Sequence, residues 1–260
     1  MRQAEPSGIG YKENPEDLDI RIRAHRDYAD FRLEDWFASN LKIGTGAALA
    51  EIGCGNGNWF GTWNQLIGPS GFLLGIDKNK DLLRIAADRT LSCKKFLLNL
   101  DINDLSAIYD TGFDAIICPY SIYYAENART CVADLHRLLG RNGRLYLIGP
   151  TSNNAKELYE LNKLIFGFEA EDRSLLRAGR LETEFLPISK EIFASVSHRV
   201  IKRGLSFPSP EAFIQYYQAT LLFDESCLKA NRVPTIENML ATQWSGRRLS
   251  KDVIVIEATC

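Results

Sequence analysis

The feature that most constrains the fold is a glycine-rich turn that directly follows a short apolar run. Residues 47–52 are apolar except for Glu51, and they lead into Gly53-Cys54-Gly55-Asn56-Gly57. Alternate glycines allow the backbone to turn sharply and to approach a ligand without Cβ collisions. The next segment, 58–67, has aromatic residues on one side. This pattern predicts a buried parallel strand, a ligand-binding turn and a helix whose free N–H groups favour an anion.

The same alternation of strand and helix continues along the chain. We expect strands at 71–77, 95–100, 113–118 and 144–148, and helices at 79–91, 127–139 and 154–166. Asn79 is expected to cap the helix at 79–91. Gly140 is expected to end the helix at 127–139 in a left-handed conformation. Five strands alternating with helices predict an α/β fold with a doubly wound, mostly parallel sheet.

The two ends of the chain depart from this pattern. Residues 1–15 are interpreted as a loose arm, and 16–41 as one helix. Residues 169–190 are charged and irregular, and strand character over 193–207 is broken at Gly204. A helix over 211–223 is expected to begin with Ser209 as its cap, and 253–259 as the last strand.

Composition limits the classes of partner. The chain has 260 residues, 45% hydrophobic and 25% charged, which suits a single globular domain. A net charge of -2 disfavours nucleic-acid binding, and no apolar run is long enough for a membrane helix. The six cysteines form no Cys-x-x-Cys pair, so we expect no metal. Scattered cysteines without a signal peptide fit a cytoplasmic protein.

The glycine spacing separates two kinds of nucleotide site. A dinucleotide-binding G-x-G-x-x-G turn would place its third glycine at position 58, where this chain has Asn58. Here the third glycine, Gly57, comes one residue early. Glu51, at the end of the strand, is suited to a cationic ammonium group. An NAD(P)-dependent oxidoreductase is therefore the less favoured alternative.

Glu51 to Gly57 resembles motif I of the class I S-adenosylmethionine (SAM)-dependent methyltransferases, E/D-x-G-x-G-x-G. The likeness extends over about residues 28–168. It implies that Asp77 binds the ribose hydroxyls, that Asp101 binds the adenine amino group, and that Ile102 packs on the ring. The implied fold is a seven-stranded Rossmann-like sheet with helices on both faces. The residues expected to bind SAM are Glu51, Gly53, Cys54, Gly55, Asn58, Trp59, Asp77, Lys78, Asp101, Ile102, Cys118 and Tyr120.

The segment after the fourth expected strand bears on the methyl acceptor. Its Cys118-Pro119-Tyr120 lacks the amide or acid found in adenine and glutamine methylases. The stretch to Tyr124 instead resembles the ubiquinone-biosynthesis-like, small-molecule branch of the family. That resemblance implies that Tyr120, Tyr123 and Tyr124 line the methyl-transfer site, although packing roles for two of them are equally open.

The N-terminal segment supplies the best candidate base. The resemblance implies a helical lid over the cofactor, and His25 lies in this segment. Tyr120, Tyr124 and His25 are therefore the candidate catalytic residues. The neighbouring Arg21, Arg23 and Arg26 are interpreted as a solvated helix face rather than as an anion site.

These observations define one methyltransferase domain with an arm and lid at 1–41, a core at 42–206 and 250–260, and a helical insertion at 207–249. The expected function is methyl transfer from SAM to an oxygen or nitrogen of a small molecule, such as a sugar or natural product, with S-adenosylhomocysteine (SAH) as the product. We expect no nucleic-acid or membrane partner, and a monomer or homodimer. A catalytically silent, methyltransferase-like scaffold subunit is the non-enzymatic alternative.

Overall fold

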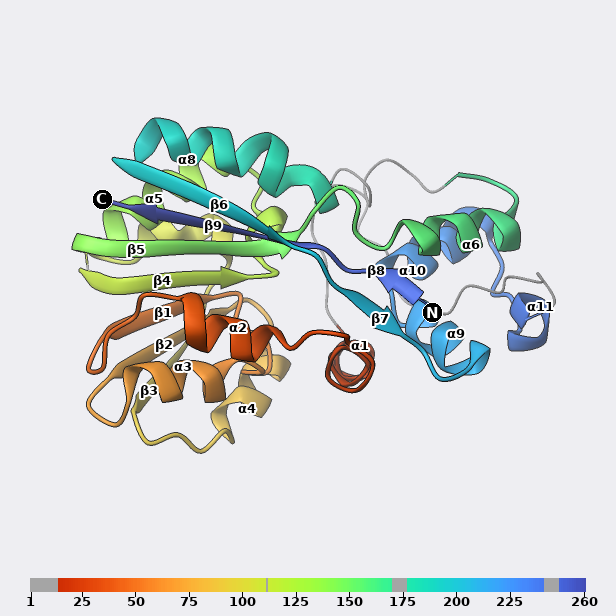
Figure 1. The fold of residues 1–260 in the computed structure, drawn as a ribbon, viewed down its shortest axis with the longest axis horizontal. Helices are drawn as coiled ribbons and strands as arrows, with labels where there is room; N and C mark the ends of the chain where they lie inside the picture. The colour runs from red at the N-terminus through yellow and green to blue at the C-terminus, as the bar shows by residue number, and fades with distance from the viewer. Residues whose placement is uncertain (1–13, 111, 170–176, 241–247) are drawn as a thin grey trace.

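A seven-stranded sheet with helices on both faces forms the larger part of the molecule (Figure 1). The computed structural model describes residues 14–110, 112–169, 177–240 and 248–260. The strand order is β3-β2-β1-β4-β5-β9-β6. β1 to β5 are parallel to one another, and β9 runs antiparallel to both β5 and β6. The strands are β1 (Ala48–Ile52), β2 (Phe72–Asp77), β3 (Lys94–Asn99), β4 (Phe113–Pro119), β5 (Leu139–Pro150), β6 (Ser195–Ile201) and β9 (Val253–Thr259).

The sheet separates two hydrophobic clusters. One contains α5 (Ala128–Leu138), the π-helical turn η3 (Leu181–Phe185) and residues packed by α8 (Leu186–Ile192). The other contains α2 (Leu33–Asn40), α3 (Phe60–Ile67) and α4 (Lys80–Ala87). Because both faces are covered, the central strands read as continuous apolar runs rather than alternating ones. The expected doubly wound, mostly parallel sheet is confirmed.

Local capping signals place several helix starts. The Asn79 side chain accepts hydrogen bonds from the N–H groups of Asp81 and Leu82, as expected. Ser209 accepts one from Ala212, with Pro210 as the first residue of α9 (Pro210–Gln218). Gly140 does not end a helix, and that prediction was wrong. Leu139 already has extended backbone angles, so α5 passes directly into β5.

The expectation of one helix over residues 16–41 was wrong. The chain forms α1 (Pro15–Asp27) and α2, separated by a short extended stretch. This stretch pairs with β7 (Gly204–Ser206): Asp30 N–H donates to the Gly204 carbonyl, and Ser206 N–H to that of Tyr28. The Asp30 carboxylate also accepts from Gly204 N and binds Arg248. These long-range contacts overrule the helical pattern of the sequence. Of the expected arm at 1–15, residues 1–13 lie outside the described residues.

Two further predictions, one of an irregular segment and one of a single helix, were wrong. Residues 177–192 are helical, although the sequence suggested an irregular segment over 169–190. The expected helix at 211–223 is divided into α9 and α10 (Leu221–Ala230), because the Thr220 hydroxyl caps a new start by accepting from Phe223 N–H. The helix over 177–192 was not predicted because its side chains are largely charged. The break between α9 and α10 was not predicted because threonine is a weak capping residue.

A second lobe lies beside the sheet (Figure 1). It consists of α6 (Lys156–Phe166), α9, α10, α11 (Ile236–Leu240) and the two-stranded ribbon of β7 and β8 (Arg248–Ser250). Its own apolar cluster buries the aromatic residues of the expected insertion: Phe213, Tyr216, Tyr217 and Phe223. α6 packs in this lobe, although the sequence placed it within the core range of 42–206, and the bounds 207–249 for the insertion stay a prediction. No described helix combines the length and apolarity needed to cross a membrane.

Candidate active-site cleft

The glycine turn after β1 forms one wall of a large cleft. Gly53, Gly55 and Gly57 all have positive φ angles, of 73°, 54° and 70°. Gly53 and Cys54 both donate their N–H groups to the Ile76 carbonyl, which ties the turn to β2. A Cβ on Gly53 would lie 2.2 Å from the Ser121 Cβ. The turn therefore requires glycine for both its backbone angles and its close approach to the segment after β4.

Glu51 lies beneath this turn. Its side chain is fully buried, and its Oε2 accepts a 2.7 Å hydrogen bond from the Trp63 indole N–H. Its Oε1 is buried with no hydrogen-bond partner. Burial raises the pKa of Glu51 well above its usual range, Trp63 opposes this, and the charge of Asp77 adds to it. The structure thus places an incompletely satisfied carboxyl group directly below the glycine turn.

Two acids stand at the ends of β2 and β3. Asp77 accepts N–H bonds of 2.8 Å from both Gly55 and Asn79, so it connects the turn with the start of α4. Burial raises the pKa of Asp77 despite these two hydrogen bonds. Asp101 begins the short helix η1 (Ile102–Ala107), and its Oδ2 lies 3.3 Å from Lys78 Nζ. Parallel strands bring these acids to one edge of the sheet, where ligands bind in open α/β folds.

The segment after β4 lines the cleft beside the glycine turn. Tyr120 has a left-handed backbone, with φ of 55°, and donates its N–H to the Ile148 carbonyl at 2.7 Å. Such strain in a residue other than glycine clusters at functional sites. Burial raises the pKa of Tyr120 to about 12, opposed by the charge of Arg203. Because of this raised pKa, Tyr120 is a protonated phenol at neutral pH. The rings of Tyr123 and Tyr124, further along the segment, lie 4.7 Å apart.

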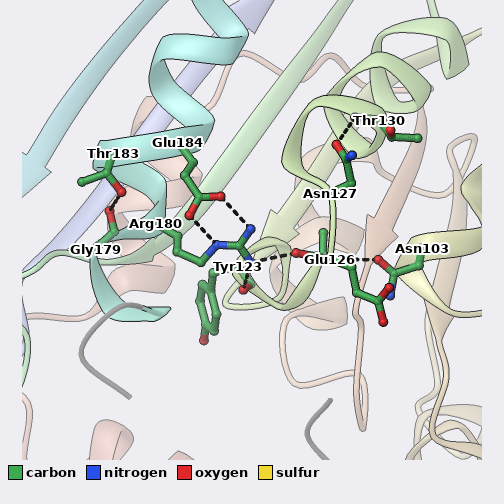
Figure 2. Close-up of polar contacts among 10 residues, drawn as sticks. Asn103, Tyr123, Glu126, Asn127, Thr130, Gly179, Arg180, Thr183 and Glu184 are labelled. Atoms are coloured by element: carbon green, nitrogen blue, oxygen red, sulfur yellow. Dashed lines mark hydrogen bonds and ion pairs between the residues drawn. The ribbon is translucent and has the colours of Figure 1, made fainter. Parts of the chain in front are cut away.

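A buried arginine holds this segment in place (Figure 2). Arg180 NH1 donates to the carbonyl oxygens of Tyr123 and Ala125, each at 2.7 Å. Its remaining nitrogens bind Glu184 on the same helical segment. On the other side, Glu126 N–H donates to Asn103 Oδ1. The backbone around the tyrosines is thus fixed from both sides.

His25 reaches the cleft from α1. Arg203 NH1 lies 3.3 Å from its Nδ1, and since a guanidinium only donates, this nitrogen accepts and the proton resides on Nε2. Burial, then the charges of Lys251, Arg203 and Arg21, lower the pKa of His25 well below its usual value. The imidazole is therefore neutral, but its basicity is reduced.

The cleft gathers most of the residues expected from the sequence. Its volume is about 2440 Å³, and its lining includes Gly53, Cys54, Gly55, Asn58, Trp59, Asp77, Lys78, Ile102, Tyr120, Tyr123, Tyr124 and His25. Three expected cofactor residues are close by but do not line it: Glu51 and Cys118 are fully buried, and Asp101 faces Lys78. Arg21, Arg23 and Arg26 all line it, although they were interpreted as a solvated helix face.

Sequence reasoning assigned no role to three cationic residues of this cleft: Arg180, Arg203 and Lys251. Arg180 lies in the segment that was taken as irregular. Arg203 and Lys251 flank the ribbon of the second lobe, and no motif surrounds them. The break at Gly204 was the one signal that the chain leaves the sheet at this point.

The described residues suit SAM in several respects. The glycine turn offers backbone without Cβ atoms, and the Asp77 carboxylate lies beside it at the end of β2. The unpartnered Glu51 oxygen beneath the turn suits a nearby cationic amino acid. Within the described segments, no group of three or more His, Cys, Asp or Glu side chains is arranged to hold a metal ion.

Sequence comparison finds methyltransferases among the proteins that are similar to this chain. Residues 50–145 match the family described as "Methyltransferase domain". A demethylmenaquinone methyltransferase of Lactococcus lactis is 29% identical over 142 residues, which cover 50% of this chain and 56% of that protein. An uncharacterized protein of Methanocaldococcus jannaschii is 28% identical over 177 residues, 63% of this chain and 46% of that protein. The chain thus spans about half the length of the curated relatives it matches.

Solved structures share the fold. A SAM-dependent methyltransferase from Aquifex aeolicus aligns with a TM-score of 0.55 at 14% identity, over 73% of this chain and 93% of that one. One from Thermotoga maritima aligns with a TM-score of 0.55 at 16% identity, over 94% and 95%. The chain therefore shares the fold of these methyltransferases, and residues 50–145 match the methyltransferase domain family. Its sequence relatives include demethylmenaquinone methyltransferases.

Proposed function

We propose that the protein transfers a methyl group from SAM to an oxygen or nitrogen of a small-molecule acceptor, with SAH as the product. The observation that carries this proposal is the convergence of the glycine turn, Asp77 and Tyr120 on one cleft. The demethylmenaquinone methyltransferases among its relatives support a small-molecule acceptor. The acceptor class that we propose is a sugar or a natural product.

The chain's own residues would position the reaction rather than supply strong acid–base chemistry. SAM supplies an electrophilic methyl group on a sulfonium; the S–CH3 bond breaks with its electron pair left on sulfur, and a bond to the acceptor forms. Holding the acceptor in line can lower the barrier by about 7–11 kcal/mol. The tyrosine segment, fixed by Arg180, is suited to this alignment.

The proton lost by the acceptor needs a destination. His25 is neutral and lines the cleft, so it is the candidate acceptor of that proton from an attacking hydroxyl. Because its Nδ1 is engaged by Arg203, it must release that contact to be protonated there. An amine that attacks as the free base can lose its proton to solvent.

The proposal is tested by incubating the purified protein with SAM and a panel of hydroxylated and amino metabolites, and measuring SAH by mass spectrometry. We expect SAH formation that depends on one acceptor class. His25→Gln should slow an oxygen acceptor about 10²-fold or more and leave SAH affinity unchanged. Binding of SAH without turnover of any acceptor favours the scaffold alternative, and binding of NAD without SAM favours the oxidoreductase.

A further inference from the structure

Two buried cations lie where the chain passes between the large sheet and the second lobe. Arg203, between β6 and β7, is 5% exposed, and Lys251, between β8 and β9, is 9% exposed. Lys251 N–H donates to the Arg203 carbonyl at 2.8 Å, so the two crossing segments are adjacent. Both side chains line the cleft.

Within the described ranges, no carboxylate forms an ion pair with the side chain of either cation, although the charge of Arg203 reaches Asp30. Asp252, next to Lys251 in the chain, accepts from the Arg203 backbone N–H through Oδ1 and from Lys202 Nζ through Oδ2. The Nε of Arg203 is buried without a hydrogen-bond partner. Burying unpaired charge and an unsatisfied donor is unfavourable, so the arrangement is one that a bound anion would complete.

The cations are held in place by the residues around them. Lys251 Nζ lies 5.1 Å from the centre of the Tyr216 ring. His25 accepts from Arg203, and its ring meets Tyr216 edge to face at 6.2 Å. Tyr216 itself is 2% exposed and packs in the core of the second lobe. Three separate parts of the chain, α1, α9 and the crossing segments, thus build one preorganised pocket wall.

We propose that Arg203 and Lys251, positioned by His25 and Tyr216, form an anion site that binds a carboxylate or phosphate group of the methyl acceptor. The acceptor is then an acidic small molecule whose anionic end is held at the second lobe. This inference rests on the proposed function, because it assigns the acceptor half of the same cleft. A guanidinium beside an ammonium suits either oxyanion, since both offer several acceptor oxygens.

The position of the site favours the acceptor over the cofactor's own carboxylate. In the sheet order, β9 is three strands away from β1, which is about 14 Å at the usual strand spacing. The glycine turn follows β1, whereas Lys251 directly precedes β9. Tyr120 lies between them, after β4, and feels the charge of Arg203. A molecule anchored at the anion site would therefore extend toward the methyl-transfer tyrosines.

The test is a calorimetric titration of the protein–SAH complex with benzoate and phenyl phosphate, and with benzamide as the neutral match. We expect at least one anion to bind about tenfold more tightly than benzamide. Lys251→Met should remove this preference, and Lys251→Arg should retain it. Lys80→Met removes one exposed cation from the same cleft outside the cluster, and should keep it.

The outcomes separate the possibilities. Equal binding of anions and benzamide, or no anion binding at about 10 mM, would overturn the anion site. So would a Lys251→Met protein that binds SAH itself about tenfold more weakly, because the cluster would then hold the cofactor. Tighter binding of benzoate would indicate an acceptor with a carboxylate, and tighter binding of phenyl phosphate would indicate one with a phosphate. Failure of the wild-type protein to bind SAH would instead contradict the proposed function.

Discussion

The buried carboxyl of Glu51 is expected to lower the stability of the protein in return for affinity toward a cation. One of its oxygens is bonded to Trp63 and the other has no partner. Glu51→Gln keeps a hydrogen-bond acceptor for Trp63 and removes the charge. The substitution should therefore stabilise the ligand-free protein at neutral pH and weaken the binding of SAM.

The direction of the change in stability follows from the pKa of Glu51, which burial raises. A carboxyl that is harder to ionise in the folded state destabilises the fold as pH rises above its unfolded pKa of about 4.3. The penalty grows by at most about 1.36 kcal/mol per pH unit, so it cannot exceed about 3.7 kcal/mol at pH 7. We expect about 1–3 kcal/mol, the usual cost of an unsatisfied buried polar group, and a Tm higher by roughly 2–10 °C.

The assay is thermal unfolding of both proteins between pH 5 and pH 8. The advantage of Glu51→Gln should be small at pH 5 and should increase toward pH 7. Glu160→Gln, which removes an equal charge from an exposed helix position, serves as the control and should show no such trend. In calorimetry, Glu51→Gln should raise the Kd for SAM about tenfold, a loss of roughly 1.4 kcal/mol. A variant that is less stable at pH 7 and binds SAM normally would refute the reasoning.

Three further substitutions test the cleft walls. Asp77→Ala removes the acceptor of two backbone N–H bonds and of the expected ribose contacts, so SAH affinity should fall about 100-fold or more, and unchanged affinity in calorimetry would exclude this carboxylate. Gly53→Ala should destabilise the protein by more than about 2 kcal/mol in thermal or urea unfolding, and Ser121→Gly in the same chain should recover part of that loss. Arg180→Lys should lower acceptor turnover while leaving SAH affinity unchanged, because it loosens the tyrosine segment alone; an equal loss of both would contradict a positioning role.

The cofactor half of the cleft follows from local sequence. Its strands are short apolar runs, and each expected site residue stands at the end of one of them. Glycine spacing and strand ends are encoded by neighbours in the chain, so Gly53, Asp77 and the start of α4 at Asn79 could be located in advance. What the sequence did not show is that Glu51 points beneath the turn, because that orientation depends on Trp63 across the α3 interface.

The acceptor half depends on contacts between distant segments. Arg203 and Lys251 are separated by the whole ribbon and three helices, yet their backbones are hydrogen-bonded. Arg180 lies in a charged stretch whose helix is stabilised by packing on the sheet rather than by a clear amphipathic pattern. The break after α1 arises from pairing of Asp30 with β7. None of these contacts has a local sequence signal, so only the structure reveals them.

The central claim is that this cleft binds SAM, and a calorimetric titration of the purified protein with SAM, SAH and NAD tests it most directly. The account predicts that SAM and SAH each bind at one site per chain, that Asp77→Ala weakens both, and that NAD gives no heat of binding. Binding of NAD, or absence of SAM and SAH binding at about millimolar concentration, would contradict it.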